Sequence, residues 1–167
     1  MEVIPGMFTT YRSDKHTYWE IPDSLIGREF AVTTTILTAP ARPDRDMEKT
    51  FGYSGDMIGP VFFSFRKQGD ELWIVDPLNE RIIENPAGIY AKIAAQRGNS
   101  RLYLRLPVKA KTQGSSLIEI GEVLKDFPLF NLDIVSFDLS IGTRLREKDC
   151  IKEIKGYDNR LLVHISR

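Results

Sequence analysis

The sequence has few of the residues that most often carry chemistry in proteins. Its 167 residues include one cysteine, Cys150, and two histidines, His16 and His164. A single cysteine excludes an internal disulfide and says nothing about the compartment of the protein. A zinc site of the H-E-x-x-H type needs two histidines one helical turn apart and a glutamate base. His16 and His164 are far apart in segments with strand patterns, so the sequence predicts no metal site and no cofactor in this chain.

An excess of charge and long apolar runs are also lacking. Lys plus Arg equals Asp plus Glu at 23 each, so no long-range field favours nucleic acid or an anionic membrane as a partner. No apolar run approaches the ~18 residues of a membrane span, and residues 1–12 lack the apolar core of a secretory signal. We therefore predict no membrane span. A natural signal upstream of this segment stays open, because a strand pattern begins almost directly after Met1.

Strand patterns dominate what is present, and most of the connections between them are short. The fold class predicted is α+β, mainly antiparallel β, as a curved sheet or sandwich of hairpins with two short helices in one domain over residues 1–167. The helices are expected near 87–96 and 121–126. The strands are expected at 7–12, 16–21, 29–37, 60–67, 71–76, 101–111, 117–120, 132–141 and 159–167, with 147–155 ambiguous.

The two tryptophans are expected to be unequally buried. Trp73 lies in the predicted hairpin of residues 60–76, where we expect it and Val75 to neighbour Phe63 and Phe65 in the core. Trp19 adjoins the polar Glu20 and is expected to be less buried. Large to small substitution at Trp73 is therefore predicted to be the costly one.

The strand at 101–111 alternates leucines with basic residues. Its second face is predicted to carry a ring and four cations: Arg101, Tyr103, Arg105, Lys109 and Lys111. Cations for phosphates and a ring for base stacking are what a single-stranded nucleic acid site uses. Edge strands carry lysine and arginine for another reason, which is to block unwanted pairing. Pro107 lacks an N–H group, so we place this strand at a sheet edge or at a bulge.

Three further patterns resemble functional motifs but are incomplete. Asp44, Asp46 and Glu48 alternate as in a calcium loop, without its glycine or its final glutamate. Residues 52–55 resemble a nucleophile elbow, but Ser54 is followed directly by glycine and no histidine is placed to activate it. Asp133 and Asp138 fall on opposite faces of a regular strand. The sequence therefore predicts no catalytic, cofactor-binding or metal-binding residues in this chain.

Three stretches together carry a family resemblance: FTTYRSDKHTYWEIPDSLIGREFAVTTTI at 8–36, FGYSGDMIG at 51–59 and IKEIKGYDNRLLV at 151–163. They resemble the domain of unknown function that precedes the catalytic domain in large bacterial zinc-dependent metallopeptidases of the metzincin type. In that family the zinc ligands belong to an H-E-x-x-H-x-x-G-x-x-H segment of the downstream domain. No part of that segment occurs here, so the resemblance carries over no catalytic residue, and zinc is expected only downstream.

The resemblance implies a non-catalytic accessory domain, not itself an enzyme, within a longer exported chain. Its expected location is extracytoplasmic, meaning periplasmic, outer-membrane-associated or secreted. Its expected partners are the downstream peptidase domain of the same polypeptide and a peptide or protein substrate. Residues 159–167 carry aliphatic residues on both faces, so we expect them to be covered on both and to lie beside the docking surface. The alternative is a free-standing binding module that uses the basic face of 101–111 for single-stranded nucleic acid or another polyanion.

Overall fold

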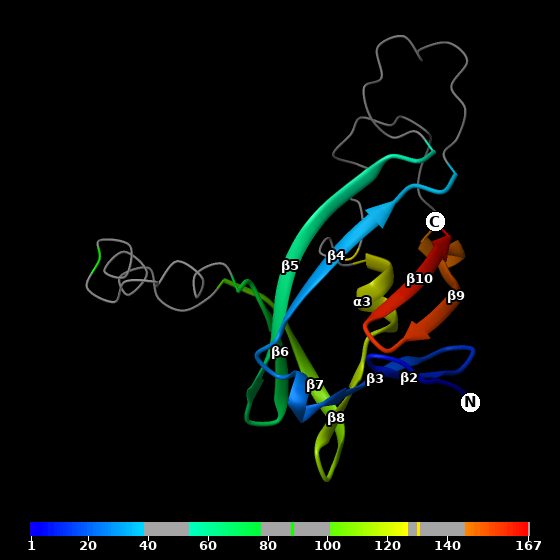
Figure 1. The fold of residues 1–167 in the computed structure, drawn as a ribbon. Coiled ribbons are helices and arrows are strands. Elements are labelled where there is room, and N and C mark those ends of the chain that lie inside the picture. Colours follow the sequence, from blue (N-terminus) through cyan, green and yellow to red (C-terminus); the bar gives the residue numbers. More distant parts are fainter. Residues whose placement is uncertain (39–53, 78–87, 89–100, 127–129, 131–145, 167) are drawn as a thin grey trace.

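The fold is built almost entirely from antiparallel strands (Figure 1). The structure is a computed structural model that describes residues 1–38, 54–77, 88, 101–126, 130 and 146–166. Eight strands form one open sheet in the order β1-β2-β3-β8-β7-β6-β5-β4, and β9 and β10 form a separate two-stranded sheet. This confirms the prediction of a mainly antiparallel β fold.

The boundaries of the strands agree closely with the hydrophobic alternation of the sequence. The strands of the large sheet are β1 (Glu2–Ile4), β2 (Thr9–Arg12), β3 (Thr17–Pro22), β4 (Glu29–Thr35), β5 (Met57–Gln68), β6 (Glu71–Val75), β7 (Leu102–Thr112) and β8 (Ser115–Glu119). The small sheet contains β9 (Cys150–Tyr157) and β10 (Arg160–Ser166).

Helical structure is sparse among the described residues. The 3-10 turns η1 (Asp23–Leu25) and η3 (Arg146–Lys148) and the helix α3 (Gly121–Asp126) are each a single turn or little more. The helix predicted at 121–126 is confirmed as α3. The helix predicted near 87–96 lies outside the described residues apart from Gly88, and the strand predicted at 132–141 lies outside them completely.

Strand β7 holds the two halves of the large sheet together. Its first part pairs with β6, ending at the pair of Pro107 with Glu71. Its second part pairs with β8, beginning at the pair of Val108 with Ile118. The prediction of an edge strand is therefore wrong, because β7 is an interior strand. Pro107 is tolerated there because it stands where one ladder ends and the other begins, next to a bulge between Val108 and Ala110.

The core lies inside the curve of this sheet and draws on both halves. Its buried side chains come from the first half (Phe8, Trp19, Ile21, Ile118, Ile120), the second half (Phe63, Phe65, Leu72, Ile74, Leu106), α3 (Leu124) and Phe130. The Phe8 ring lies 5.3 Å from the Phe30 ring and 5.7 Å from the Phe65 ring, between centroids. Residues from opposite ends of the strand order thus meet, which explains the strong curvature of the sheet.

The burial of the two tryptophans is the reverse of the prediction. Trp19 is only 3% exposed and belongs to the core, whereas Trp73 is half-buried. The register explains the reversal, because Phe65 pairs with Ile74 and directly paired residues share a face. Leu72 and Ile74 therefore point into the core, and Trp73 points away from it. A polar neighbour such as Glu20 indicates only that the adjacent residue faces the opposite side.

The β9–β10 hairpin packs one face on the core and exposes the other. Leu161, Val163 and Ile165 contact the core, while Leu162 is 50% exposed. The expectation that this strand is covered on both faces is therefore wrong for the chain as it stands. The hairpin also joins the N-terminal strands, since the Met7 amide donates to the Tyr157 carbonyl at 2.7 Å.

Candidate functional site

The predicted basic face of residues 101–111 does not exist as one surface. A second bulge, opposite Ile74 and Val75, breaks the alternation of β7, and Tyr103 packs against the core beside Leu104. Lys111 pairs with the buried Ser116, so it starts from the inner face of the sheet. These bulges separate the ring and the cations that the sequence pattern had placed together.

The cations of β7 are also engaged within the chain. The Arg105 guanidinium lies 4.8 Å from the centre of the Trp73 ring, and Lys111 Nζ lies 2.7 Å from Asp70 Oδ1. Lys109 Nζ lies 3.8 Å from Glu119 Oε2. A polyanion site needs a continuous row of cations free to meet phosphates. The geometry of β7 therefore argues against the alternative of a nucleic-acid module.

The other sequence candidates remain dispersed. His16 lies before β3 and His164 on β10, and the residues that the structure describes contain no group of three His, Cys, Asp or Glu side chains suited to a metal ion. Gly55 follows Ser54 in the turn before β5 at φ 97°, which fits a turn serine. The remaining candidates lie outside the described residues: Asp44, Asp46, Glu48, Gly52, Tyr53, Asp133 and Asp138.

The most organised polar surface lies instead on the outer face of the sheet, around Tyr18. Tyr18 pairs with Tyr11 of β2 on one side and with Glu119 of β8 on the other. His16 and Glu20 precede and follow it at two-residue spacing, which places them on the same face. We call these five residues the Tyr18 platform. Buried Trp19 and Ile21 alternate with its members, so the strand pattern at 16–21 contained the only sequence signal for this surface.

One end of the platform is organised by the carboxylate of Glu20. Ser115 Oγ donates to Glu20 Oε1 at 2.5 Å, and the Tyr11 hydroxyl donates to Glu20 Oε2 at 2.7 Å. These two hydrogen bonds, that of Ser115 first, lower the pKa of the Glu20 carboxyl below its ordinary value. The same contact with Glu20 raises the pKa of the Tyr11 hydroxyl, with smaller contributions from burial and from the carboxylate charge. Glu20 is therefore held in the ionised form.

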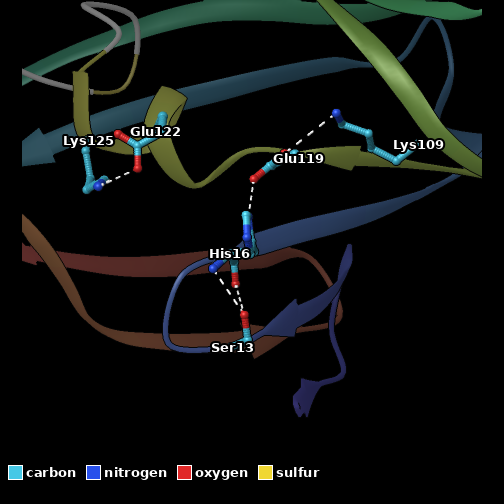
Figure 2. A network of polar contacts seen from close by, with 6 residues as sticks. All are labelled: Ser13, His16, Lys109, Glu119, Glu122 and Lys125. Atoms are coloured by element: carbon cyan, nitrogen blue, oxygen red, sulfur yellow. Dashed lines mark hydrogen bonds and ion pairs between the residues drawn. The ribbon is translucent and has the colours of Figure 1, made fainter.

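The other end of the platform contains a histidine and a carboxylate in close contact. Figure 2 shows His16 Nδ1 beside Glu119 Oε1, at 2.6 Å, and Lys109 on the far side of Glu119. The His16 ring is stacked with the Tyr18 ring at 25° between planes and 6.0 Å between centroids. Nearby, Glu122 and Lys125 form their own ion pair on α3 at 2.6 Å. The platform thus combines three rings with two carboxylates.

Comparison with known families gave one finding. Residues 1–39 match the model of a domain of unknown function, DUF5118. Comparisons with curated proteins and with solved structures gave no significant match. The DUF5118 match covers β1 to β4 and four members of the Tyr18 platform, whereas Glu119 comes from β8. No described helix is both long enough and apolar enough to cross a membrane.

We expect the Glu20 contacts to make stability depend on acidity. Because folding lowers the pKa of Glu20, the stabilisation is present above the pKa of the unfolded chain, ordinarily about 4.3. It should be lost as the pH falls through the lower, folded pKa. Glu20→Gln leaves either Ser115 or Tyr11 without its acceptor, so this variant should be less stable at neutral pH and should lose less on acidification. Urea unfolding from pH 7 to pH 3 measures both effects.

The control for this measurement is Glu153→Gln, since Glu153 lies on β9 and 53% of its side chain is exposed. This variant should keep the acid dependence of the unaltered chain. An acid dependence equally steep in Glu20→Gln and in the unaltered chain would contradict the role assigned to Glu20.

Proposed function

We propose that this chain is a non-catalytic accessory domain of a bacterial, extracytoplasmic zinc-dependent metallopeptidase, and that it packs against a downstream catalytic domain of the same polypeptide. The observation that carries the proposal is the structural use of the motif residues that suggest this family. Ile21 of the E-I-P-D-S-L motif is fully buried, and Gly27 ends the following turn at φ 76°. Residues kept for packing and turns are those expected of a scaffold domain.

The two ends of the chain that carry the resemblance also form one body. Arg12 Nη2 donates to the Ile151 carbonyl at 2.5 Å, and Met7 is hydrogen-bonded to Tyr157. Gly156 approaches Pro5 and Gly6 so closely that no side chain fits between them. The DUF5118 region therefore packs directly on the C-terminal hairpin. This supports treating the resemblance as a property of one domain that includes residues 151–163.

We place the docking surface for the catalytic domain on the outer face of the β9–β10 hairpin. Leu162 pairs with Lys155 on that face, and Leu162 is 50% and Tyr157 40% exposed. Aliphatic and aromatic side chains exposed on a two-stranded sheet favour further packing, because two strands alone are marginally stable in water.

Cross-linking mass spectrometry on the native polypeptide tests this proposal. An antibody raised against the chain would isolate the polypeptide from cells that carry the gene, after treatment with an amine-reactive cross-linker. We expect peptides from an H-E-x-x-H segment downstream of residue 167 in the same polypeptide. We also expect cross-links from Lys155, whose side chain is 54% exposed, to that downstream domain.

Lys111 is the matched control, because it is similarly exposed at 52% and lies beside Asp70 of the β5–β6 turn. It should form no cross-links to the downstream domain. A captured polypeptide without any H-E-x-x-H segment would refute the accessory function. Cross-links from Lys111 in place of Lys155 would refute only the docking surface.

A further inference from the structure

The Tyr18 platform places two carboxylates on either side of one aromatic ring. Glu119 pairs with Tyr18 across the sheet, and Glu20 follows Tyr18 along β3. Glu20 and Glu119 are thus diagonal neighbours across the β3–β8 ladder, with Cβ atoms about 7–8 Å apart or slightly less. Two like charges at this spacing repel each other and attract a cation between them.

The cations of the chain compensate this charge only in part. Lys109 Nζ is 3.8 Å from Glu119 Oε2, which is beyond hydrogen-bond distance. Within the described part of the chain, no hydrogen bond reaches Glu119 Oε2, and the Glu119 side chain is 32% exposed. With His16 neutral, Glu20, Glu119 and Lys109 together carry a net charge of −1, in a chain whose formal net charge is zero. An ionised oxygen is therefore available to an incoming donor.

The rings of the platform favour a flat cation over a compact one. Tyr18 and Tyr11 are directly paired and half-buried, and His16 lies nearly parallel to Tyr18. Aromatic faces attract cations, and a planar guanidinium stacks on a ring while its edge donates two parallel hydrogen bonds to a carboxylate. An ammonium forms no such fork.

We propose that the Tyr18 platform binds the guanidinium of an arginine side chain in a partner polypeptide. The guanidinium stacks on the Tyr18 ring and donates to Glu119 Oε2, and Glu20 supplies the second negative charge. The positive charge of the partner complements the net negative charge of the platform. This inference is independent of the proposed function, because it needs neither a peptidase domain nor export.

Titration of the ¹⁵N-labelled 167-residue chain with capped tripeptides tests the site. The probes are acetyl-Gly-Arg-Gly-amide, its lysine counterpart and its citrulline counterpart, which has the shape of arginine without the charge. A single anchoring residue should bind with a dissociation constant of about 1 mM. We expect NMR shift changes centred on Tyr18 and Glu119, weaker binding of the lysine peptide and no binding of the citrulline peptide.

Two glutamine variants separate the site from general charge effects. Glu119→Gln should weaken binding of the arginine peptide about tenfold, as expected for loss of a charged hydrogen bond. Glu122→Gln removes the same charge from the neighbouring α3, where Glu122 is 75% exposed and paired with Lys125, and should leave the affinity unchanged. Both substitutions are nearly isosteric, so thermal unfolding should show both variants folded.

Several outcomes would overturn the proposal. Equal binding of the citrulline peptide would remove the role of charge, and equal weakening by Glu122→Gln would show a diffuse electrostatic effect. Equal affinity for the lysine peptide would refute the assignment to a guanidinium. Absence of any shift at 10 mM arginine peptide, about ten times the expected dissociation constant, would remove the site altogether.

Discussion

Trp19→Ala should lower the free energy of unfolding by about 3–5 kcal/mol, the usual range for removing a large buried ring. Trp19 is 3% exposed and is surrounded by aromatic rings, with the Phe8 ring at 5.0 Å and the Phe130 ring at 6.0 Å between centroids. Its removal leaves a cavity where the N-terminal strands meet the rest of the core. Urea denaturation followed by far-UV circular dichroism measures the change without depending on tryptophan fluorescence.

Trp73→Ala is the matched control for this measurement. Trp73 is half-buried on the outer face, with the Arg105 guanidinium over its ring and its indole N–H donating to Glu71 Oε2 at 2.7 Å. Loss of these contacts should cost about 1 kcal/mol. A loss at Trp73 as large as that at Trp19 would contradict the burial of the two rings.

A second control uses Trp19→Phe, which keeps an aromatic ring in the cavity. The Trp19 indole N–H is buried with no hydrogen-bond partner in the described part of the chain. Trp19→Phe therefore removes an unsatisfied donor together with part of the ring, and it should cost clearly less than Trp19→Ala.

Gly156→Ala should be among the most damaging single-methyl additions in the chain. A Cβ atom at Gly156 would fall on the carbonyl oxygen of Pro5 and lie 2.9 Å from its carbonyl carbon. Both atoms are backbone, so they have no side-chain rotation by which to yield. We expect a loss of about 3 kcal/mol or more, at or above the upper end for overpacking. Urea denaturation measures the loss.

Amide exchange shows where the damage from Gly156→Ala falls. The Met7 amide should lose protection, because it donates to Tyr157 next to the added methyl group, while the amides of β3 and β8 should be less affected. Lys155→Ala, on the exposed side of the same strand, is the control and should be nearly neutral. Unchanged stability together with a protected Met7 amide would show that the two ends of the chain do not depend on this close approach.

The sequence specified local elements better than it specified faces. Alternation and turn residues located β2, β3, β5, β6 and β10 to within a few residues, because register and twist alter these signals little. The identity of the buried face failed for β6 and β7. In β6 the register turned Trp73 outward, and in β7 bulges moved Tyr103 and Lys111 out of the predicted basic row. Bulges leave no regular mark in a sequence.

The Tyr18 platform was even less accessible to sequence reasoning. Tyr18 and Glu20 could be placed on one face of one strand from their spacing alone. Their contact with Glu119 depends on the pairing of β3 with β8, which joins segments roughly a hundred residues apart. Short-range patterns predict hairpins, whereas a pairing of such long range is decided by the whole core.

The pairing of β3 with β8 also affects how the chain is made. Tyr18 leaves the ribosome roughly a hundred residues before its partner Glu119. At about 5–20 residues per second, β3 waits about 5–20 s with one edge unpaired and with Trp19 and Ile21 uncovered. Long-range strand pairing of this kind folds slowly, on the scale of milliseconds to seconds even after synthesis. The N-terminal hairpin is therefore the segment of the nascent chain most in need of protection by a chaperone.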